Sequence, residues 1–316
     1  MNLAACKFQA ALFMCYQTSI WLKLRTSQVF RVMISFSSCL FFGNPFMQQS
    51  VWRTAYGDIT YWQNQPAAAS ETVVLLHGAA MNHAMFALQY QAWASRYRVL
   101  VWDMPMHGAS RPFTPVSMLQ MARFLEYIVE HEQLSAVHVV GQSMGGMVAQ
   151  YWAQIAPARI KSLSLIDSIP LNPRYRSKVD VWALKTVPFF TKLSFKPQAI
   201  PRIAQKIATT AAAQNYVQQR FAELDKAELV SIMRVLVEGI NGATETELKM
   251  PVQAIVGEHD GLGKVKAYNE KWHQQERVPL HVIKGAGHNA NMDAAAAVNG
   301  ALEAWIERAS YQRPPQ

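Results

Sequence analysis

Residues 137–149 read VHVVGQSMGGMVA, and the interpretation of the whole chain follows from this stretch. A short apolar run, typical of a buried strand, ends at Gly141, and helix-forming residues begin at Met144. Ser143 therefore lies in a predicted turn between a strand and a helix. A turn of this kind strains the backbone, and Gly141 and Gly145 leave room for the strand and the helix to approach. Ser143 is predicted to lie at the carboxyl edge of a sheet, where ligands bind in open α/β folds.

A Gly-x-Ser-x-Gly pattern is weak evidence when it stands alone. At average frequencies of glycine and serine, such a pattern arises by chance in roughly one in ten chains of this length. The pattern gains weight only from its context, which is a strand before the serine, a helix after it, and partner residues elsewhere in the chain.

Strand-like runs alternate with helix-like segments from Met47 onward, and this alternation predicts a mostly parallel sheet covered by helices on both faces. The predicted strands are 59–62, 72–78, 97–103, 136–141, 160–167, 252–257 and 280–285, and the predicted helices are 117–133, 144–156, 264–276 and 293–309. The interval from about 170 to 249 has no convincing buried strand. Its apolar residues follow helical spacing, so it predicts a helical unit inserted into the α/β pattern.

The first 46 residues differ in composition from the rest of the chain. They hold four basic residues, no acidic residue and all three cysteines, whereas the chain as a whole is 51% hydrophobic with a net charge of +9. We interpret residues 1–46 as a leader or upstream extension outside the fold, and residues 47–316 as the folded domain. The protein is then expected to be cytoplasmic if the chain effectively starts near Met47, and exported if residues 1–46 act as a targeting leader.

The charge pattern bears on the choice of partner. Beyond residue 46 the basic residues nearly balance the acidic ones, and no basic stripe is interleaved with aromatic residues. This pattern argues against nucleic acid as a partner. Neither apolar patch of residues 1–46 reaches the roughly 18 clean apolar residues of a membrane span, so no span is predicted. The oligomeric state is left open.

A serine hydroxyl needs a base to remove its proton, and His288 is the best candidate among nine histidines. It lies in KGAGHNANM, between the last predicted strand and the last predicted helix, with small residues on both sides. The base needs a carboxylate to orient it. Asp260, which follows the penultimate strand in VGEHDG, is favoured, and Asp167, which ends the strand after Ser143, remains an alternative.

Two backbone N–H groups are predicted to stabilise an oxyanion beside the serine. Met144 begins the helix after Ser143, so its N–H points toward the site. Ala79 lies in HGAA at 77–80, in a loop that follows an apolar strand and turns on Gly78. His77 in the same loop is interpreted as a structural residue that orients the loop.

These motifs resemble those of the α/β-hydrolase superfamily over residues 51 to 310. The motifs that carry the resemblance are HGAA at 77–80, DMPMHGAS at 103–110, GQSMGG at 141–146, GEHD at 257–260 and GAGH at 285–288. The resemblance implies an eight-stranded, mostly parallel sheet with helices on both faces and a helical cap, here about 170–249, inserted after strand 6. Members of the superfamily often have Gly where this chain has Met106, which puts only the local turn shape in doubt.

The resemblance also implies a cofactor-free serine hydrolase of the carboxylesterase type, with Ser143 as nucleophile, His288 as base and Asp260 as acid. An aspartate would stand at position 143 in related dehalogenases and epoxide hydrolases, so those reactions are not expected. No metal-binding or dinucleotide-binding motif is found. The same triad also serves carbon–carbon bond hydrolases, lactonases, thioesterases, acyltransferases and perhydrolases, and the fold also occurs in non-catalytic binding proteins.

The aromatic and apolar residues of the inserted unit raise a question about the substrate. They could line the roof of the pocket and favour a partly hydrophobic small-molecule acyl substrate, or they could pack the insertion on the sheet. We expect packing of the insertion on the sheet to account for most of these residues. The residues concerned are Trp182, Val187, Phe189, Phe190 and Phe195.

Overall fold

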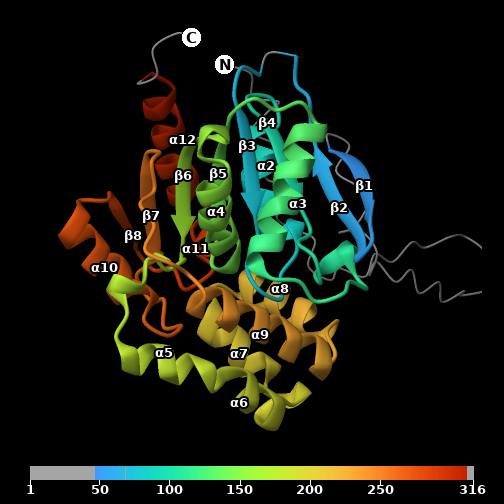
Figure 1. Ribbon diagram of the computed structural model, residues 1–316, viewed down its shortest axis with the longest axis vertical. Helices are drawn as coiled ribbons and strands as arrows, with labels where there is room; N and C mark the ends of the chain where they lie inside the picture. The colour runs from blue at the N-terminus through green and yellow to red at the C-terminus, as the bar shows by residue number, and fades with distance from the viewer. Residues whose placement is uncertain (1–46, 68, 312–316) are drawn as a thin grey trace, which may run out of the picture. The chain divides into compact units, whose positions relative to one another are not determined.

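The structure is a computed structural model that describes residues 47–67 and 69–311 (Figure 1). The segment 1–46, interpreted above as a leader or extension, lies outside these residues, and so does the C-terminal end after Tyr311. Among the residues described, no helix is both long enough and apolar enough to cross a bilayer.

Within the described residues, eight strands form one sheet in the order β1-β2-β4-β3-β5-β6-β7-β8. β2 runs antiparallel to β1 and β4, whereas the pairs β3–β4, β3–β5, β5–β6, β6–β7 and β7–β8 are parallel. The strands are β1 Gln48–Thr54, β2 Gly57–Gln63, β3 Thr72–Leu76, β4 Arg98–Trp102, β5 Val137–Gln142, β6 Ile160–Ile166, β7 Val252–Gly257 and β8 Leu280–Ile283. The predicted fold class is therefore confirmed.

Helices cover the two faces of this sheet, as Figure 1 shows. α3 (Met118–His131) packs on α4 (Met144–Ile155), which contacts β3, β5 and β6. α2 (Ala87–Trp93) packs with α12 (Ala295–Tyr311), which contacts β6 and β8. α10 (Val265–Glu276) follows β7, and the short α11 (Ala290–Asp293) precedes α12. Because both faces are covered, every residue of β5 and β7 is buried, which explains the continuous apolar runs in the sequence.

Outside the helical interval 170–249, β1, α2 and the four-residue α11 are absent from the sequence prediction. β1 is an edge strand, with Val51 51% exposed and no residue of the strand fully buried, so it lacks the apolar run that marks the central strands. α2 is only seven residues long, too short for a clear helical period.

Five helices lie between β6 and β7, inside the interval 170–249 that was predicted to be helical. They are α5 Lys178–Lys185, α6 Val187–Ser194, α7 Ile200–Ile207, α8 Ala211–Ala222 and α9 Lys226–Asn241. Figure 1 shows them gathered beyond the carboxyl ends of the parallel strands. We call this segment, residues 178–241, the helical insertion.

Candidate functional site

Ser143 occupies a sharp turn between β5 and α4, with φ of 48° and ψ of −116°. A positive φ is costly for a residue with a side chain, and it persists only where the surroundings impose it. Here the surroundings are two glycines. A Cβ at Gly141 would lie 2.5 Å from the backbone of Gly146, and a Cβ at Gly145 would lie 2.1 Å from the Leu76 carbonyl oxygen. The strand and helix can approach closely only with these glycines, and their approach holds Ser143 in its turn.

Three side chains from separate strand ends form a hydrogen-bonded line. The Nε2 of His288 lies 2.9 Å from the Ser143 hydroxyl oxygen, and its Nδ1 lies 2.9 Å from Oδ2 of Asp260. The Asp260 carboxylate is fully buried, and its other oxygen accepts a hydrogen bond from the Leu262 N–H at 2.9 Å. The arrangement allows the imidazole to take the serine proton while the carboxylate faces the opposite ring nitrogen.

The residue beside the serine also supports the histidine. The Gln142 side-chain amide donates to the backbone carbonyl of His288 at 2.8 Å. The turn that carries Ser143 is therefore tied directly to the loop that carries His288.

Asp167, the alternative carboxylate, has different partners. Its two oxygens accept hydrogen bonds from the N–H groups of Gly257, at 2.7 Å, and Ala290, at 3.0 Å. Complete burial, with the charge of Asp260 nearby, raises the pKa of the Asp167 carboxyl well above its usual range. Asp167 links the end of β7 to the segment after His288, whereas Asp260 is the carboxylate bonded to the imidazole.

The two predicted oxyanion donors lie next to Ser143. Met144 is the first residue of α4. Ala79 lies inside a turn closed by a hydrogen bond from the Met81 N–H to the Gly78 carbonyl at 3.2 Å. A Cβ at Gly78 would lie 3.3 Å from the Cβ of Ser143, so this loop passes very close to the serine. We refer to residues 77–83 as the oxyanion loop.

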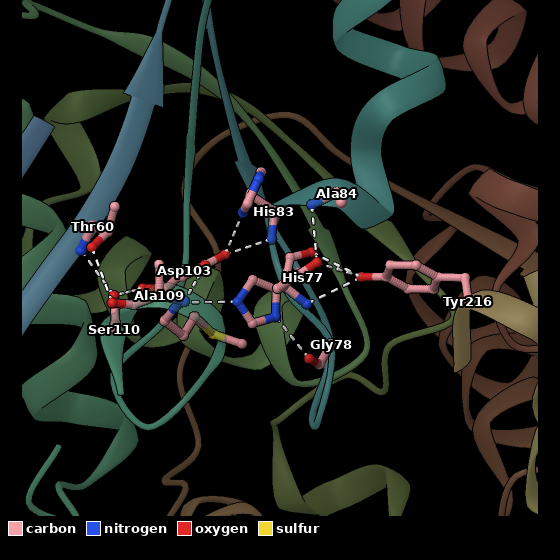
Figure 2. Close-up of polar contacts among 11 residues, drawn as sticks. Thr60, His77, Gly78, His83, Ala84, Asp103, Ala109, Ser110 and Tyr216 are labelled. Carbon is pink, nitrogen blue, oxygen red and sulfur yellow. Dashed lines mark hydrogen bonds and ion pairs between the residues drawn. The ribbon is translucent and has the colours of Figure 1, made fainter. Parts of the chain in front are cut away.

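His77 fixes the start of the oxyanion loop (Figure 2). Its Nδ1 donates to the Gly78 carbonyl at 2.8 Å, and its Nε2 accepts from the Met104 N–H at 2.9 Å. A ring nitrogen that accepts a hydrogen bond carries no proton, so the ring is neutral. Burial lowers the pKa of His77 to about 3, which agrees with this arrangement.

Asp103 fixes the far end of the same loop. Its carboxylate accepts from the backbone N–H of His83 at 2.6 Å, from the His83 ring at 2.9 Å and from the Ala109 N–H at 2.6 Å. Burial alone would raise the pKa of Asp103, but the bonds and charge of His83 outweigh it and lower the pKa. The loop is thus held by a buried carboxylate at one end and a neutral histidine at the other.

Tyr216 brings the helical insertion to the oxyanion loop. Its side chain extends from α8, and its hydroxyl accepts from the Asn82 N–H at 3.1 Å and donates to the Asn82 side-chain oxygen at 2.9 Å (Figure 2). Burial raises the pKa of Tyr216, so the hydroxyl keeps its proton. Sequence analysis missed this pair, because neither residue belongs to a motif and a tyrosine in a helix carries no signal of its partner.

Two further contacts fasten the helical insertion to the α/β core. The Asp293 carboxylate accepts from the N–H groups of Thr209 and Thr210, each at 2.9 Å, and also from the Gly287 N–H at 2.9 Å beside His288. The Arg111 guanidinium donates to both carboxylate oxygens of Glu228 in α9, at 2.9 Å each. These bonds tie the link between α7 and α8, and the start of α9, to the α/β core.

Met106 lies in a turn where members of the superfamily often have glycine. Met106 has φ of 74°, the conformation that a glycine adopts without strain, and its side chain is buried. The turn thus keeps a glycine-type backbone although the residue is methionine.

The expectation that the aromatic residues of the insertion mainly pack it on the sheet is wrong for three of them. Trp182 is 68% exposed, Phe189 63% and Phe190 55%, whereas Phe195 is partly buried and packs against the core. Helical spacing predicts which residues share a face, but it does not indicate whether that face is covered.

Among the described residues, no group of three or more His, Cys, Asp and Glu side chains is arranged to hold a metal ion. The pairs and networks above are hydrogen-bonded to the backbone or to each other.

Comparisons with known proteins agree with this architecture. The dihydrolipoyllysine-residue acetyltransferase component of the acetoin cleaving system from Pseudomonas putida is 24% identical over 260 residues, which are 80% of this chain and 68% of the relative. A pimeloyl-[acyl-carrier protein] methyl ester esterase from Chromobacterium violaceum is 38% identical over 98 residues, but these are only 31% of this chain and 37% of the relative.

A solved structure shows the same fold over most of the chain. The enol-lactonase from Burkholderia xenovorans LB400 superposes with a TM-score of 0.67 at 19% identity, covering 82% of this chain and 100% of that one. The family model described as "alpha/beta hydrolase fold" matches residues 71–295, the region that contains Ser143, Asp260 and His288. The chain therefore belongs to the alpha/beta hydrolase fold family.

Proposed function

We propose that this protein is a cofactor-free serine hydrolase that cleaves an ester-like carbonyl through an acyl-enzyme. The observation that carries the proposal is the line Ser143, His288 and Asp260, with both hydrogen bonds at 2.9 Å. A weak nucleophile, a base within reach of it and a carboxylate that orients the base are the three parts that this chemistry requires.

The first half of the reaction forms the acyl-enzyme. The Ser143 oxygen attacks the carbonyl carbon as Nε2 of His288 takes the hydroxyl proton, and the carbonyl oxygen becomes an oxyanion. The tetrahedral intermediate then collapses. The bond to the leaving group breaks, and His288 returns its proton to the departing oxygen.

The second half regenerates the enzyme. His288 takes a proton from a water molecule, the hydroxyl oxygen attacks the acyl carbonyl, and a second tetrahedral intermediate breaks to release the acid. The proton passes from His288 back to the Ser143 oxygen. Asp260 stabilises the imidazolium in both halves and holds Nδ1 as the protonated nitrogen.

The N–H groups of Ala79 and Met144 are proposed to hold the oxyanion. They come from two different elements, the oxyanion loop and the first turn of α4, and both elements adjoin Ser143. Donors fixed before the reaction cost no reorganisation when charge develops, and removal of one such donor typically costs about 10²–10³-fold in rate.

We further propose that residues 47–316 form the catalytic domain and that the segment of about 170–249 caps the acyl site. The position of the helical insertion beyond the carboxyl ends of the strands and the bond between Tyr216 and Asn82 support this proposal. The similarity to a methyl ester esterase in one third of the chain favours carboxylic esters over other acyl compounds.

A fluorophosphonate probe tests the nucleophile. The wild type should be labelled and should hydrolyse short-chain nitrophenyl esters, and Ser143→Ala should do neither. Ser117→Ala is a matched control, because Ser117 is an exposed helix cap remote in the chain from the motif and should leave labelling unchanged. Equal labelling of wild type and Ser143→Ala would refute the proposal.

A substrate panel then tests the reaction class. The panel compares nitrophenyl esters, thioesters, lactones and diketones as substrates. Each substrate is measured with water as the sole acceptor and again with an added alcohol or peroxide as a competing acceptor. Preferred hydrolysis of simple esters supports the carboxylesterase assignment. Faster turnover with thioesters, lactones or diketones, or transfer to the added acceptor in preference to water, would replace that assignment while leaving the role of Ser143 intact.

A further inference from the structure

The outer helices of the insertion carry large apolar side chains that face solvent. Exposed fractions are 72% for Val179, 68% for Trp182, 63% for Phe189 and 66% for Leu193. Single exposed apolar residues are common on protein surfaces, but several large ones together on neighbouring helical turns mark an interaction site. We call these four residues the apolar band.

The apolar band lies on one side of α5 and α6. Val179 and Trp182 are three residues apart in α5, and Phe189 and Leu193 are four apart in α6, so each pair shares a helix face. Only Thr186 separates the two helices. Both helices contact α9 on their inner side, and Figure 1 shows them on the outside of the insertion, away from the sheet. The exposed faces are therefore the outer faces.

Lysines border the apolar band. Lys185, Lys192 and Lys196 are all exposed. The one acidic residue between positions 178 and 196 is Asp180, and its carboxylate already pairs with Lys264 at 2.6 Å. The outer face of α5 and α6 thus combines tryptophan, phenylalanine and leucine with an excess of positive charge.

We propose that this face docks on an anionic lipid surface. A helix that lies in a membrane interface has Trp, Phe and Leu on its buried side and Lys or Arg beside them, and α5 and α6 meet this description. The proposal does not depend on the chemistry at Ser143. It brings the helical insertion next to a lipid surface.

A second copy of the chain fits this face less well. A two-fold contact places the same patch on both partners, so the lysines at the border would face lysines and repel each other. An anionic lipid surface complements these charges, and each lysine near such a surface adds about five-fold in affinity at physiological salt.

Vesicle co-sedimentation with the full chain tests the proposal. One set of vesicles contains phosphatidylcholine with 30% phosphatidylglycerol, and the other contains phosphatidylcholine alone. The variants are Trp182→Ser with Phe189→Ser, and Lys185→Glu with Lys192→Glu. Tyr127→Ser is the matched control, because Tyr127 is 52% exposed on α3, outside the helical insertion. Thermal unfolding of each variant verifies that it is folded.

The wild type and Tyr127→Ser should bind the anionic vesicles at least ten-fold more tightly than the neutral ones, and less tightly as salt rises. The affinity of each double variant for the anionic vesicles should be at least ten-fold lower than that of the wild type. Retained binding by the double variants, equal binding to both vesicle types, or no binding by the wild type would overturn the proposal. The proposal would also be overturned if the wild type dimerised in the absence of lipid and the Trp182 and Phe189 substitutions abolished this dimerisation.

Ser143→Ala is measured beside these variants and is expected to bind vesicles as the wild type does. Loss of probe labelling and loss of vesicle binding are therefore separate results, and the failure of one proposal is distinguishable from the failure of the other.

Discussion

The turn at Ser143 and the outer face of α5 and α6 are constrained in opposite ways. At the turn almost every atom has a neighbour, and one added methyl group at Gly145 would lie 2.1 Å from a backbone oxygen. On the outer face a tryptophan side chain is 68% exposed. The residue types of the first region are restricted by steric contacts within the protein. Those of the second region are explained by the proposed contact with a lipid surface. Substitutions in the two regions should therefore have effects of very different size, and four predictions test this contrast.

The largest expected effect is on turnover, at Asp260. Asp260→Asn keeps the shape of the side chain but removes the charge that holds the His288 ring, and we expect kcat to fall about 10⁴-fold. Steady-state hydrolysis of a nitrophenyl ester measures this. Asp167→Asn is the matched control, since its carboxylate bonds backbone N–H groups instead, and it should reduce stability more than kcat. The reverse result would exchange the roles of the two residues.

The next effect is a loss of stability in acid, from His77. Its pKa falls from an ordinary value near 6.5 to about 3 in the folded protein, so the unfolded chain binds the proton more tightly. The free energy of unfolding should therefore be unaffected by His77 above pH 6.5, and it should decrease by about 1.4 kcal/mol for each pH unit below that, until the pH nears 3.

Urea unfolding at pH 7, 6, 5 and 4 measures this dependence. The glutamine side chain of the His77→Gln variant cannot be protonated. The slope of the free energy of unfolding against pH between pH 6 and pH 4 should therefore be smaller by about 1.4 kcal/mol per pH unit, which corresponds to one proton. An unchanged slope would mean that the ring is already charged in the folded protein, and the neutral arrangement with Met104 would be wrong.

A smaller effect is expected where the insertion meets the core, at Tyr216. Tyr216→Phe removes the hydroxyl and leaves the Asn82 N–H and side-chain oxygen without this partner, which should cost about 1–3 kcal/mol of stability. Because Asn82 directly follows the turn that contains Ala79, kcat should fall while KM changes little. Thermal unfolding and steady-state kinetics check both effects. A change in KM with kcat unaltered would show that Tyr216 acts on substrate binding instead.

The smallest effect is expected on the outer face. Trp182→Ser should change the free energy of unfolding by no more than about 0.5 kcal/mol, because the side chain is largely in solvent before the substitution. Hydrolysis of a water-soluble ester should also be unchanged. A stability loss above 2 kcal/mol would show that Trp182 is packed inside the protein, and the contrast between the two regions would fail.

The sequence predicts the turn and the central strands because they follow strict local rules. Gly141 is required by its close contact with Gly146 in the turn itself. Gly145 is required by its close contact with the Leu76 carbonyl oxygen at the end of the neighbouring strand β3. The strands β3 to β7 are marked by apolar runs, since helices cover both sides of this part of the sheet. A motif with a steric reason can therefore be recognised from the sequence once a strand before it and a helix after it are also predicted.

The remaining features depend on contacts between distant parts of the chain. Tyr216 and Asn82 are 134 residues apart, and no local pattern connects them. The edge strand β1 is half exposed and resembles a loop in composition. Trp182 and Phe189 follow the same helical spacing as core residues, so the sequence shows that they share a face with apolar neighbours but not that the face is bare.

The location of the insertion between β6 and β7 bears on how new specificities can arise on this scaffold. Ser143, Asp260 and His288 all lie outside residues 178–241, so the segment can be exchanged without touching the chemistry. An exchanged segment would still have to supply a hydroxyl for Asn82, a pair of N–H groups for Asp293 and a carboxylate for Arg111. These three hydrogen-bonding positions on the α/β core define the minimum set of partners that a transplanted segment must supply.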